Sequence, residues 1–288
     1  MSASPRAARS RACLTRGHCS RARTLEKVNR RHRCDEPNSD AYIRDLIVTT
    51  PLVEAVYHSA IQSLKLPEGS RGLDAGCGIG LQALVLAEAV GASGEVIGLD
   101  ISPALLAHAG RLVEEAGLSG RISFKEGDVG KLPFKDGTFD WAWSANCVGY
   151  APIEPVPRLG ELARVVKPGG TVAILAWSSE QLLPGYPLLE ARLAATSSGI
   201  APFARGKDPA SHFLRALGWY SELGLEERTA RTFAGDVSAP LSVSELEAMT
   251  ALFNMRWPGV ESELSDEDRA EYERLCKPYS KDFILNAP

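Results

Sequence analysis

The sequence predicts an α/β protein whose doubly wound, mostly parallel sheet is covered by helices on both faces. Two observations predict this fold. Short apolar segments alternate with longer amphipathic ones between residues 71 and 177, and a glycine-rich turn follows the first of the short segments. Strands that alternate with helices at this spacing form parallel sheets, because each connection must cross over the sheet.

The individual elements follow from hydrophobic periodicity and turn residues. Residues 41–64 have apolar side chains at helical spacing, and Pro51 divides them into two short predicted helices. The predicted strands are 72–75, 95–100, 122–126, 140–144 and 171–177, and the helices between them are 81–90, 102–116 and 156–166. Beyond the sheet we expect helices at 188–196, 211–223, 244–256 and 266–276, and a strand at 225–233.

Composition predicts four regions along the chain. Residues 1–40 are a disordered, Arg-rich extension, because they combine many basic residues with no hydrophobic periodicity. An organelle transit peptide, a nucleic-acid-binding tail and a non-native extension remain alternatives for this segment. Residues 41–70 are expected to form N-terminal helices that lie over the ligand-binding site of the core. The core spans 71–235 and includes a cap segment at 178–210, and 236–288 form a C-terminal helical extension.

Charge, hydropathy and cysteine spacing exclude several classes of protein. Without residues 1–33, the chain has 22 basic and 35 acidic residues, which argues against a nucleic-acid-binding surface. No apolar stretch is long enough for a membrane span. The cysteines show neither disulfide nor CxxC metal spacing, so we expect free thiols, no metal and a cytoplasmic location. Organelle targeting by residues 1–33 stays open.

The strongest motif is the glycine-rich turn in Leu73-Asp74-Ala75-Gly76-Cys77-Gly78-Ile79-Gly80. Glycines allow a tight backbone and let a ligand lie directly against the chain near a helix N-terminus. The nicotinamide-binding pattern GxGxxG would need its third glycine at position 81, which is Leu81. The spacing GxGxG therefore disfavours a nicotinamide oxidoreductase.

Four further segments accompany this turn in a fixed order. Asp100 ends the second strand, and three motifs follow: Glu126-Gly127-Asp128-Val129 with Leu132-Pro133-Phe134, Phe139-Asp140-Trp141-Ala142-Trp143-Ser144, and Arg164-Val165-Val166-Lys167-Pro168-Gly169-Gly170. This set resembles the class I S-adenosylmethionine-dependent methyltransferases, in the branch of the ubiquinone and menaquinone biosynthesis enzymes (methyltransferase type 11-like). The resemblance covers about residues 70–177 and implies a Rossmann-like fold.

The resemblance also implies S-adenosylmethionine as the cofactor and assigns the residues that bind it. The glycine turn would hold the methionine part, Asp100 the ribose hydroxyls and Asp128 the adenine edge. The residues expected to bind the cofactor are Asp74, Gly76, Cys77, Gly78, Gly80, Asp100, Ile101, Gly127, Asp128, Val129 and Asn146.

The substrate is expected to be a small, apolar or aromatic metabolite, with an oxygen, carbon or nitrogen acceptor. Tyr150, Cys147 and His58 are weak candidates for a catalytic base, and a methyl sulfonium needs none. A cofactor-binding sensor or scaffold without transferase activity is the alternative.

Family members commonly end their sheet with an antiparallel strand. Either Asp282–Leu285 supplies this strand here, or the sheet has an exposed edge that a second copy of the chain could cover in a homodimer.

Overall fold

The computed structural model describes residues 39–149, 154–201, 208–278 and 280–284. The chain divides into two units, 1–33 and 34–288, and every described residue belongs to the second. The expected disordered extension thus lies outside the described residues, apart from its last two, which begin helix α2 (Ser39–Val48). In the described part of the chain, no helix has both the length and the apolar character to cross a membrane.

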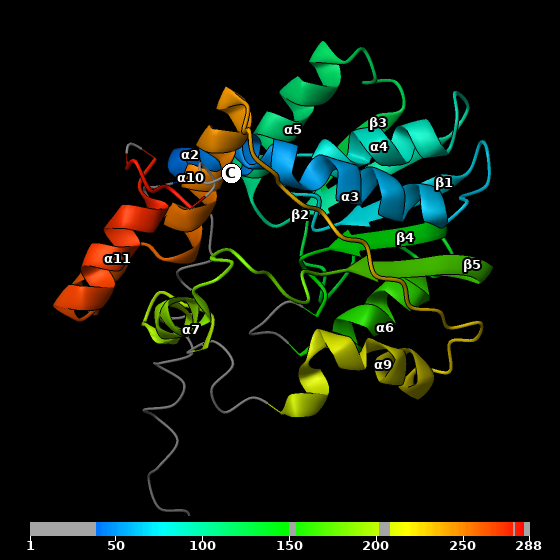
Figure 1. Ribbon diagram of the computed structural model, residues 1–288. Coiled ribbons are helices and arrows are strands. Elements are labelled where there is room, and N and C mark those ends of the chain that lie inside the picture. Colours follow the sequence, from blue (N-terminus) through cyan, green and yellow to red (C-terminus); the bar gives the residue numbers. More distant parts are fainter. Residues whose placement is uncertain (1–38, 150–153, 202–207, 279, 285–288) are drawn as a thin grey trace, which may run out of the picture. The chain divides into compact units, whose positions relative to one another are not determined.

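Five parallel strands form the sheet (Figure 1). In chain order they are β1 (Arg71–Ala75), β2 (Glu95–Asp100), β3 (Ile122–Glu126), β4 (Phe139–Ala145) and β5 (Val166–Leu175). Their spatial order is β3-β2-β1-β4-β5, so the direction of winding reverses between β1 and β4. Ligands of open α/β sheets bind at such a reversal, beyond the carboxyl ends of the strands.

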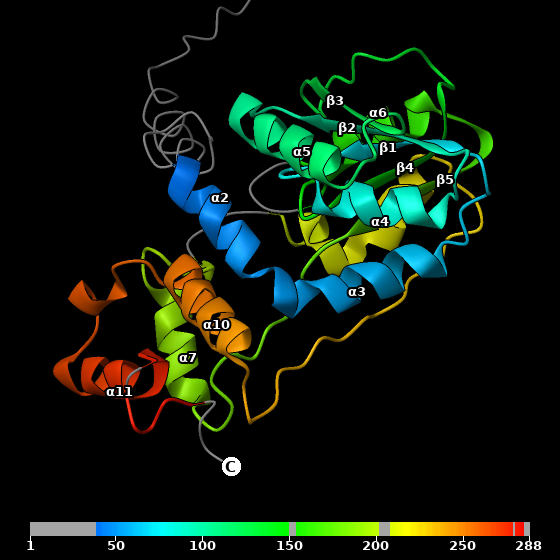
Figure 2. The ribbon, with the colours of Figure 1, turned by 90° about the horizontal axis from the view of Figure 1, so that it is seen from above.

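Helices cover both faces of this sheet, as the sequence predicted (Figures 1 and 2). One face is covered by α3 (Thr50–Ser63), α4 (Leu81–Ala89) and α5 (Pro103–Glu115), and the other by α6 (Pro155–Val165) and α9 (Ala216–Glu222). Each face has its own cluster of buried apolar side chains. The doubly wound, Rossmann-like fold is therefore confirmed.

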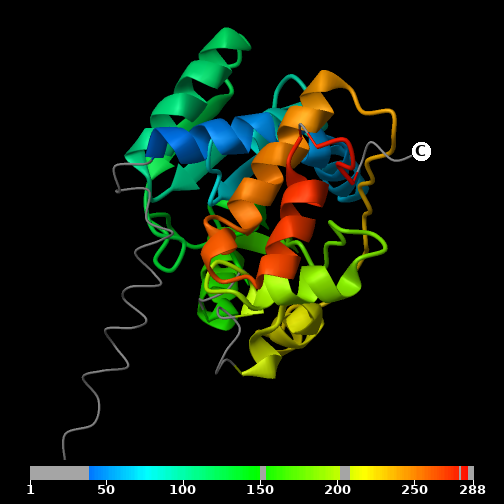
Figure 3. The ribbon, with the colours of Figure 1, turned by 60° about the vertical axis from the view of Figure 1, so that its left-hand side comes forward.

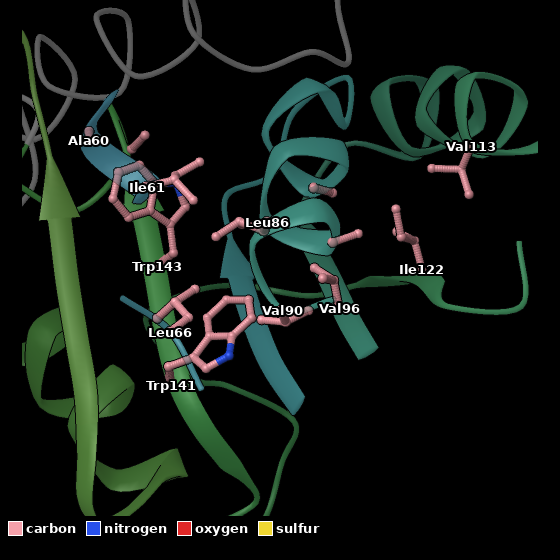
Figure 4. Close-up of a cluster of buried hydrophobic side chains, with 13 residues drawn as sticks. Ala60, Ile61, Leu66, Leu86, Val90, Val96, Val113, Ile122, Trp141 and Trp143 are labelled. Carbon is pink, nitrogen blue, oxygen red and sulfur yellow. The ribbon is translucent and has the colours of Figure 1, made fainter. Parts of the chain in front are cut away.

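Two tryptophans of β4 fill the core on the α3–α4 face (Figure 4). Trp141 is 1% exposed and donates from Nε1 to Ser70 Oγ at 2.9 Å, and Trp143 is 2% exposed and donates to Gln82 Oε1 at 2.6 Å. Both indoles thus satisfy their polar atom within the core, as buried tryptophans generally do. They are structural, and no part of either ring is free for a substrate.

The helices begin where local sequence signals place them. Pro51 occupies the first turn of α3, where a missing N–H costs nothing, so the expected break between α2 and α3 is confirmed. The Ser102 hydroxyl accepts from Leu105 N and caps α5, with Pro103 at its first position. Ser242 caps α10 (Val243–Arg256) in a reciprocal capping box with Glu245.

Three helices outside the sheet layers share a third hydrophobic core (Figure 3). They are α7 (Pro187–Ala195), α10 and α11 (Asp266–Cys276), which we call the helical cap. Phe253, Trp257 and Tyr272 are each at most 5% exposed at its centre. Helix α10 also contacts α2 and α3. Helix α7 from the expected cap segment and the C-terminal helices, which the sequence analysis assigned to separate regions, thus pack into one body.

One predicted strand is wrong, and the described residues of the alternative edge strand at 282–285 form no strand. Residues 225–233 form no strand, because Glu227 has a left-handed φ of 50° and four of the nine side chains are charged. Residues 282–284 form none either: Phe283 is buried in the core of the helical cap, and Ile284 N donates to Leu275 O. Among the described residues, β5 therefore pairs with β4 alone.

Candidate functional site at the carboxyl ends of β1, β2 and β4

The glycine turn lies between β1 and α4, at the point where the winding reverses. Gly76 N and Cys77 N both donate to Leu99 O, at 2.7 and 3.0 Å, which ties the turn to the end of β2. Gly76 has a φ of 78°, and a Cβ there would lie 2.7 Å from Cys147 Sγ. Only glycine satisfies both constraints.

Gly78, two residues later, faces open space. Its φ is 54°, and no atom lies within 4 Å of the position that a Cβ would take. Cys77, between the two glycines, turns its thiol toward the sheet, because its Sγ lies 3.0 Å from the Cβ position of Gly98. The turn therefore offers backbone, and no side chain of its own, to a ligand at this point.

Asp100, at the end of β2, stabilises the glycine turn through a hydrogen bond. Its Oδ2 accepts from Gly78 N and its Oδ1 from Ser102 N, both at 2.9 Å. Burial raises the pKa of Asp100, and the backbone N–H groups oppose that shift. A carboxylate has about four lone-pair sites, so each oxygen can accept a further hydrogen bond from a ligand.

Asp74, in β1, is a buried acid with an unpaired oxygen. The residue is 1% exposed, and its Oδ2 has no hydrogen-bond partner among the described residues. Burial, and secondarily the charge of Asp100, raise the pKa of Asp74 to about 8. Unpaired buried polar atoms are rare and costly, so this oxygen points to a missing partner.

Asn146 connects the end of β4 to two neighbouring elements. Its backbone is left-handed, with a φ of 50°, and its N–H donates to Leu175 O at 2.8 Å. Its Oδ1 accepts from Trp177 N at 3.2 Å, and its Nδ2 donates to the hydroxyl of Tyr57, on α3, at 3.3 Å. The side chain thus fixes both α3 and the end of β5 beside the glycine turn.

The segment after β3 forms the outer wall of the site. Gly127 N donates to Asp100 O at 3.0 Å, and the Asp128 carboxylate accepts from Gly130 N at 2.7 Å, which closes a local turn. Val129 is buried, whereas Ile101 is 63% exposed directly after Asp100. Ile101 is therefore an exposed apolar side chain next to the partly buried Asp100.

The three candidate bases fall in different places. Cys147 contacts the glycine turn, and burial raises its pKa to about 11. His58 is on α3, and its Nε2 lies 3.9 Å from Glu54 of the same helix. Tyr150 lies outside the described residues.

Tyr57 is the site residue that the sequence analysis missed. It precedes His58 in α3, its hydroxyl meets Asn146, and Asp74 is close enough to affect its pKa, which burial raises. No sequence motif marks it, because its partner is 89 residues away in the chain. The helical spacing of the apolar residues Val56, Ala60 and Ile61 does indicate which face of this helix packs against the core.

Comparisons with known proteins agree with this arrangement. A family model described as a methyltransferase domain matches residues 73–170. Demethylmenaquinone methyltransferase from Bacillus licheniformis is 32% identical over 193 residues, covering 62% of this chain and 80% of that protein. A sterol 24-C-methyltransferase from Gibberella zeae is 32% identical over 137 residues, which cover 47% of this chain and 35% of that enzyme. Across such relatives, the chain spans between 32% and 80% of their length.

A solved structure shows the same fold. A protein from Methanococcus maripaludis, assigned as an S-adenosylmethionine-dependent methyltransferase, superposes with a TM-score of 0.50 at 20% identity, covering 69% of this chain and 89% of that one. The fold and the site thus define a Rossmann-like α/β protein with a candidate ligand site at the winding reversal. The family model and the sequence relatives identify the family: the chain belongs to the class I S-adenosylmethionine-dependent methyltransferases.

The residues present fit the cofactor of this family. S-adenosylmethionine carries a sulfonium and an ammonium group, so it needs acidic or neutral acceptors around its charged end. The unpaired Asp74 oxygen is such an acceptor, Asp100 keeps acceptor capacity for hydroxyl groups, and the open space at Gly78 leaves room for the ligand.

Proposed function

We propose that this protein transfers a methyl group from S-adenosylmethionine to a small, apolar or aromatic metabolite. The observation that carries the proposal is the convergence of Asp74, Asp100 and Asn146 around the glycine turn, at the carboxyl ends of β2, β1 and β4. Each acid retains an acceptor that the protein leaves available, as expected for a cationic ligand.

Different residues are proposed to bind the methionine, ribose and adenine parts of the cofactor. The turn residues Gly76, Cys77, Gly78 and Gly80 hold the methionine part, and Asp100 accepts from the ribose hydroxyls. Ile101 and the segment Gly127-Asp128-Val129 enclose the adenine, which is supported by the 63% exposure of Ile101. Asn146 lies nearest the reacting end, because it follows β4 beside the turn.

Methyl transfer needs alignment and exclusion of water more than acid–base chemistry. The bound cofactor supplies a methyl group on an electrophilic sulfonium. Asn146 fixes the Tyr57 side chain on one side of the site and the backbone of Trp177 on another, which restricts the approach of water and of the acceptor. The aromatic ring of Tyr57 favours a flat or apolar acceptor.

The acceptor must be nucleophilic without much help from the protein. Cys147, with its pKa raised to about 11, stays protonated near neutral pH and is a poor base. The His58 imidazole lies 3.9 Å from the Glu54 carboxylate, one turn away on the same helix. An acceptor that ionises easily, such as a hydroquinone or an activated carbon acid, meets this requirement, and O-, C- and N-acceptors stay open.

The segment 178–210 and the helices beyond 236 are proposed to cover the acceptor. This is supported by the common core of α7, α10 and α11 and by the contacts of α10 with α2 and with α3, the helix that carries Tyr57. The relatives named for demethylmenaquinone and sterols also act on apolar molecules. The acceptor is therefore expected to contact the helical cap as well as the sheet.

The test is acceptor-dependent formation of S-adenosylhomocysteine. The purified protein is incubated with S-adenosylmethionine and a panel of demethylmenaquinone, tocopherols, sterols and polar amines, and the product is measured by mass spectrometry. Turnover with the apolar members, lost in Asp100→Ala, supports the proposal. Cofactor binding without turnover on any acceptor would favour a sensor or scaffold instead.

The partners and the location of the protein are proposed from its charge, its sheet edge and its first 33 residues. The acidic balance of residues 34–288 argues against a nucleic-acid partner. The edge of β5, unpaired in the described residues, would suit a second copy in a homodimer, which light scattering would detect. A cytoplasmic location is proposed, with organelle targeting by residues 1–33 as the alternative that localisation of a tagged chain would distinguish.

A further inference from the structure

The buried acid Asp74 lacks a fixed counter-ion. It projects from β1 toward the face covered by α3 and α4, it is 1% exposed, and its Oδ2 accepts no hydrogen bond from any described residue. An ionised carboxylate in such a place costs several kcal/mol unless a cation or a set of donors compensates it. The protein must therefore keep this acid neutral or pair it with something it binds.

The titratable groups around Asp74 come from four elements, and none of them is basic. They are Asp100 on β2, Tyr57 on α3, Cys77 in the glycine turn and Cys147 after β4. Each of these groups is either neutral or negative. Within the described ranges, the charge that acts on Asp74 is the like charge of Asp100, whereas the nearby Arg158 acts on Cys147.

We propose that Asp74 holds a proton in the free protein and releases it to solvent when a cationic group of the ligand enters beside it. This inference rests on the proposed function, which supplies the cation as the sulfonium or the ammonium of S-adenosylmethionine. The exchange balances: the protonated acid and the cation become an ion pair, and the buffer takes up one proton. Asp74 is thereby an exchangeable counter-ion of the site.

The energetics favour this exchange near neutral pH. Burial and the charge of Asp100 raise the pKa of Asp74 to about 8, so the free protein is mostly protonated there at neutral pH. A cation within about 4 to 6 Å shifts a carboxyl pKa down by roughly 1 to 3 units, which is enough to reverse the protonation. Proton release should therefore be largest between the lowered pKa of Asp74 in the complex and its pKa of about 8 in the free protein, and it should fade on either side of this range.

The position of Asp74 places it within reach of such a ligand. It precedes Gly76 by two residues, and Gly78, whose N–H donates to Asp100, borders open space. The hydroxyl of Tyr57 lies on the same face and accepts from Asn146. A cation at the turn would thus meet Asp74, Asp100 and Tyr57 together, and none of them would repel it.

Calorimetry in different buffers tests the exchange. The full chain is titrated with S-adenosylmethionine at about pH 7 in buffers that differ in ionisation enthalpy, because protons released to the buffer add its enthalpy to the signal. The observed enthalpy should vary with the buffer in proportion to about one released proton. At about pH 9 the dependence should nearly vanish, since Asp74 is already ionised there.

The matched variant is Asp74→Asn, which keeps the shape of the side chain and removes its titration. It should still bind the cofactor, more weakly, with no buffer dependence. Binding by the wild type without buffer dependence, or the same dependence in the variant, would overturn the inference and leave the proposed function intact. A wild type that fails to bind at all would overturn the proposed function with it.

S-adenosylhomocysteine distinguishes the two sources of the cation, because it retains the ammonium and lacks the sulfonium. Proton release with both ligands assigns the ammonium as the partner of Asp74. Release with S-adenosylmethionine alone assigns the sulfonium. In that case the site would also discriminate between the methyl donor and its product, which would leave as Asp74 regains its proton.

Discussion

At the scale of single residues, Asn146 joins three parts of the site from a backbone conformation that most residues avoid. Its φ of 50° directs the side chain between Tyr57 on α3 and Trp177 beyond β5. Non-glycine residues in this region are held there by their surroundings, and asparagine tolerates it better than most. The conformation is thus a cost that the hydrogen bonds of the side chain help to offset.

Two substitutions at Asn146 separate the effect of its backbone conformation on stability from the effect of its side-chain hydrogen bonds. Asn146→Gly and Asn146→Ala both remove the bonds to Tyr57 and Trp177, but only alanine must adopt the left-handed conformation with a Cβ. We expect the alanine variant to be less stable than the glycine variant by about 1 kcal/mol. Urea denaturation of the two proteins measures this difference, and equal stabilities would show that the backbone strain is not real.

Sequence motifs could predict the residues that act through the backbone or at strand ends. The glycine turn, Asp74 and Asp100 lie where the resemblance places them, and Asp100 contacts the turn directly. Tyr57 and Trp177 could not be predicted, because their hydrogen bonds to Asn146 join residues 89 and 31 positions away. Such contacts depend on how α3 and β5 pack, which no local pattern specifies.

At the scale of elements, β1 and β4 pair closely because a glycine faces an indole. Gly72 is paired with Trp141 across the two parallel strands, and a Cβ on Gly72 would lie 2.0 Å from the indole ring. The ring is fixed from its other end by the bond to Ser70. Gly72 therefore makes room for the largest side chain in this core.

A pair of glycine substitutions tests this packing. Gly72→Ala forces the Trp141 ring to move, and we expect a loss of at least about 1 to 3 kcal/mol of unfolding free energy. Gly110→Ala is the matched control: Gly110 is exposed in α5 and has open space around it, so alanine should stabilise by up to about 1 kcal/mol. Chemical denaturation of both variants gives the comparison. Similar effects at the two sites would contradict this account of the β1–β4 interface.

The order and type of most elements could be predicted from periodicity, and the exceptions have physical causes. The strands at 95–100 and 122–126 and the helix at 266–276 have their predicted bounds. The strand expected at 225–233 is absent because Glu227 has a left-handed backbone and four of the nine side chains are charged. The common core of the helical cap depends on contacts between α7 and helices far along the chain, which periodicity does not show.

At the scale of the whole molecule, the buried acid Asp74 should make stability depend on pH. Its pKa is raised from about 3.9 in the unfolded chain to about 8 in the folded protein, so the folded state binds the proton more tightly. The stability associated with this proton is fully present below about pH 4 and is lost as pH rises toward 8. Above that pH the loss is complete.

Asp74→Asn isolates this contribution in the absence of cofactor. The wild type should lose unfolding free energy relative to the variant as pH rises through this window, at up to about 1.4 kcal/mol per pH unit. Urea denaturation at a series of pH values from about 5 to 8 measures the difference between the two proteins. A difference that stays constant, or that favours the wild type at higher pH, would show that Asp74 is not protonated in the folded state.

The central claim is that the carboxyl ends of β1, β2 and β4 form a site for S-adenosylmethionine. Calorimetric titration of the wild type and of Asp100→Ala, with S-adenosylmethionine and separately with NAD, tests it most directly. We predict a dissociation constant on the order of micromolar for S-adenosylmethionine, weakened at least about tenfold in the variant, which corresponds to about 1.4 kcal/mol. NAD should not bind. A wild type that prefers NAD, or that binds S-adenosylmethionine equally well without Asp100, would contradict the claim.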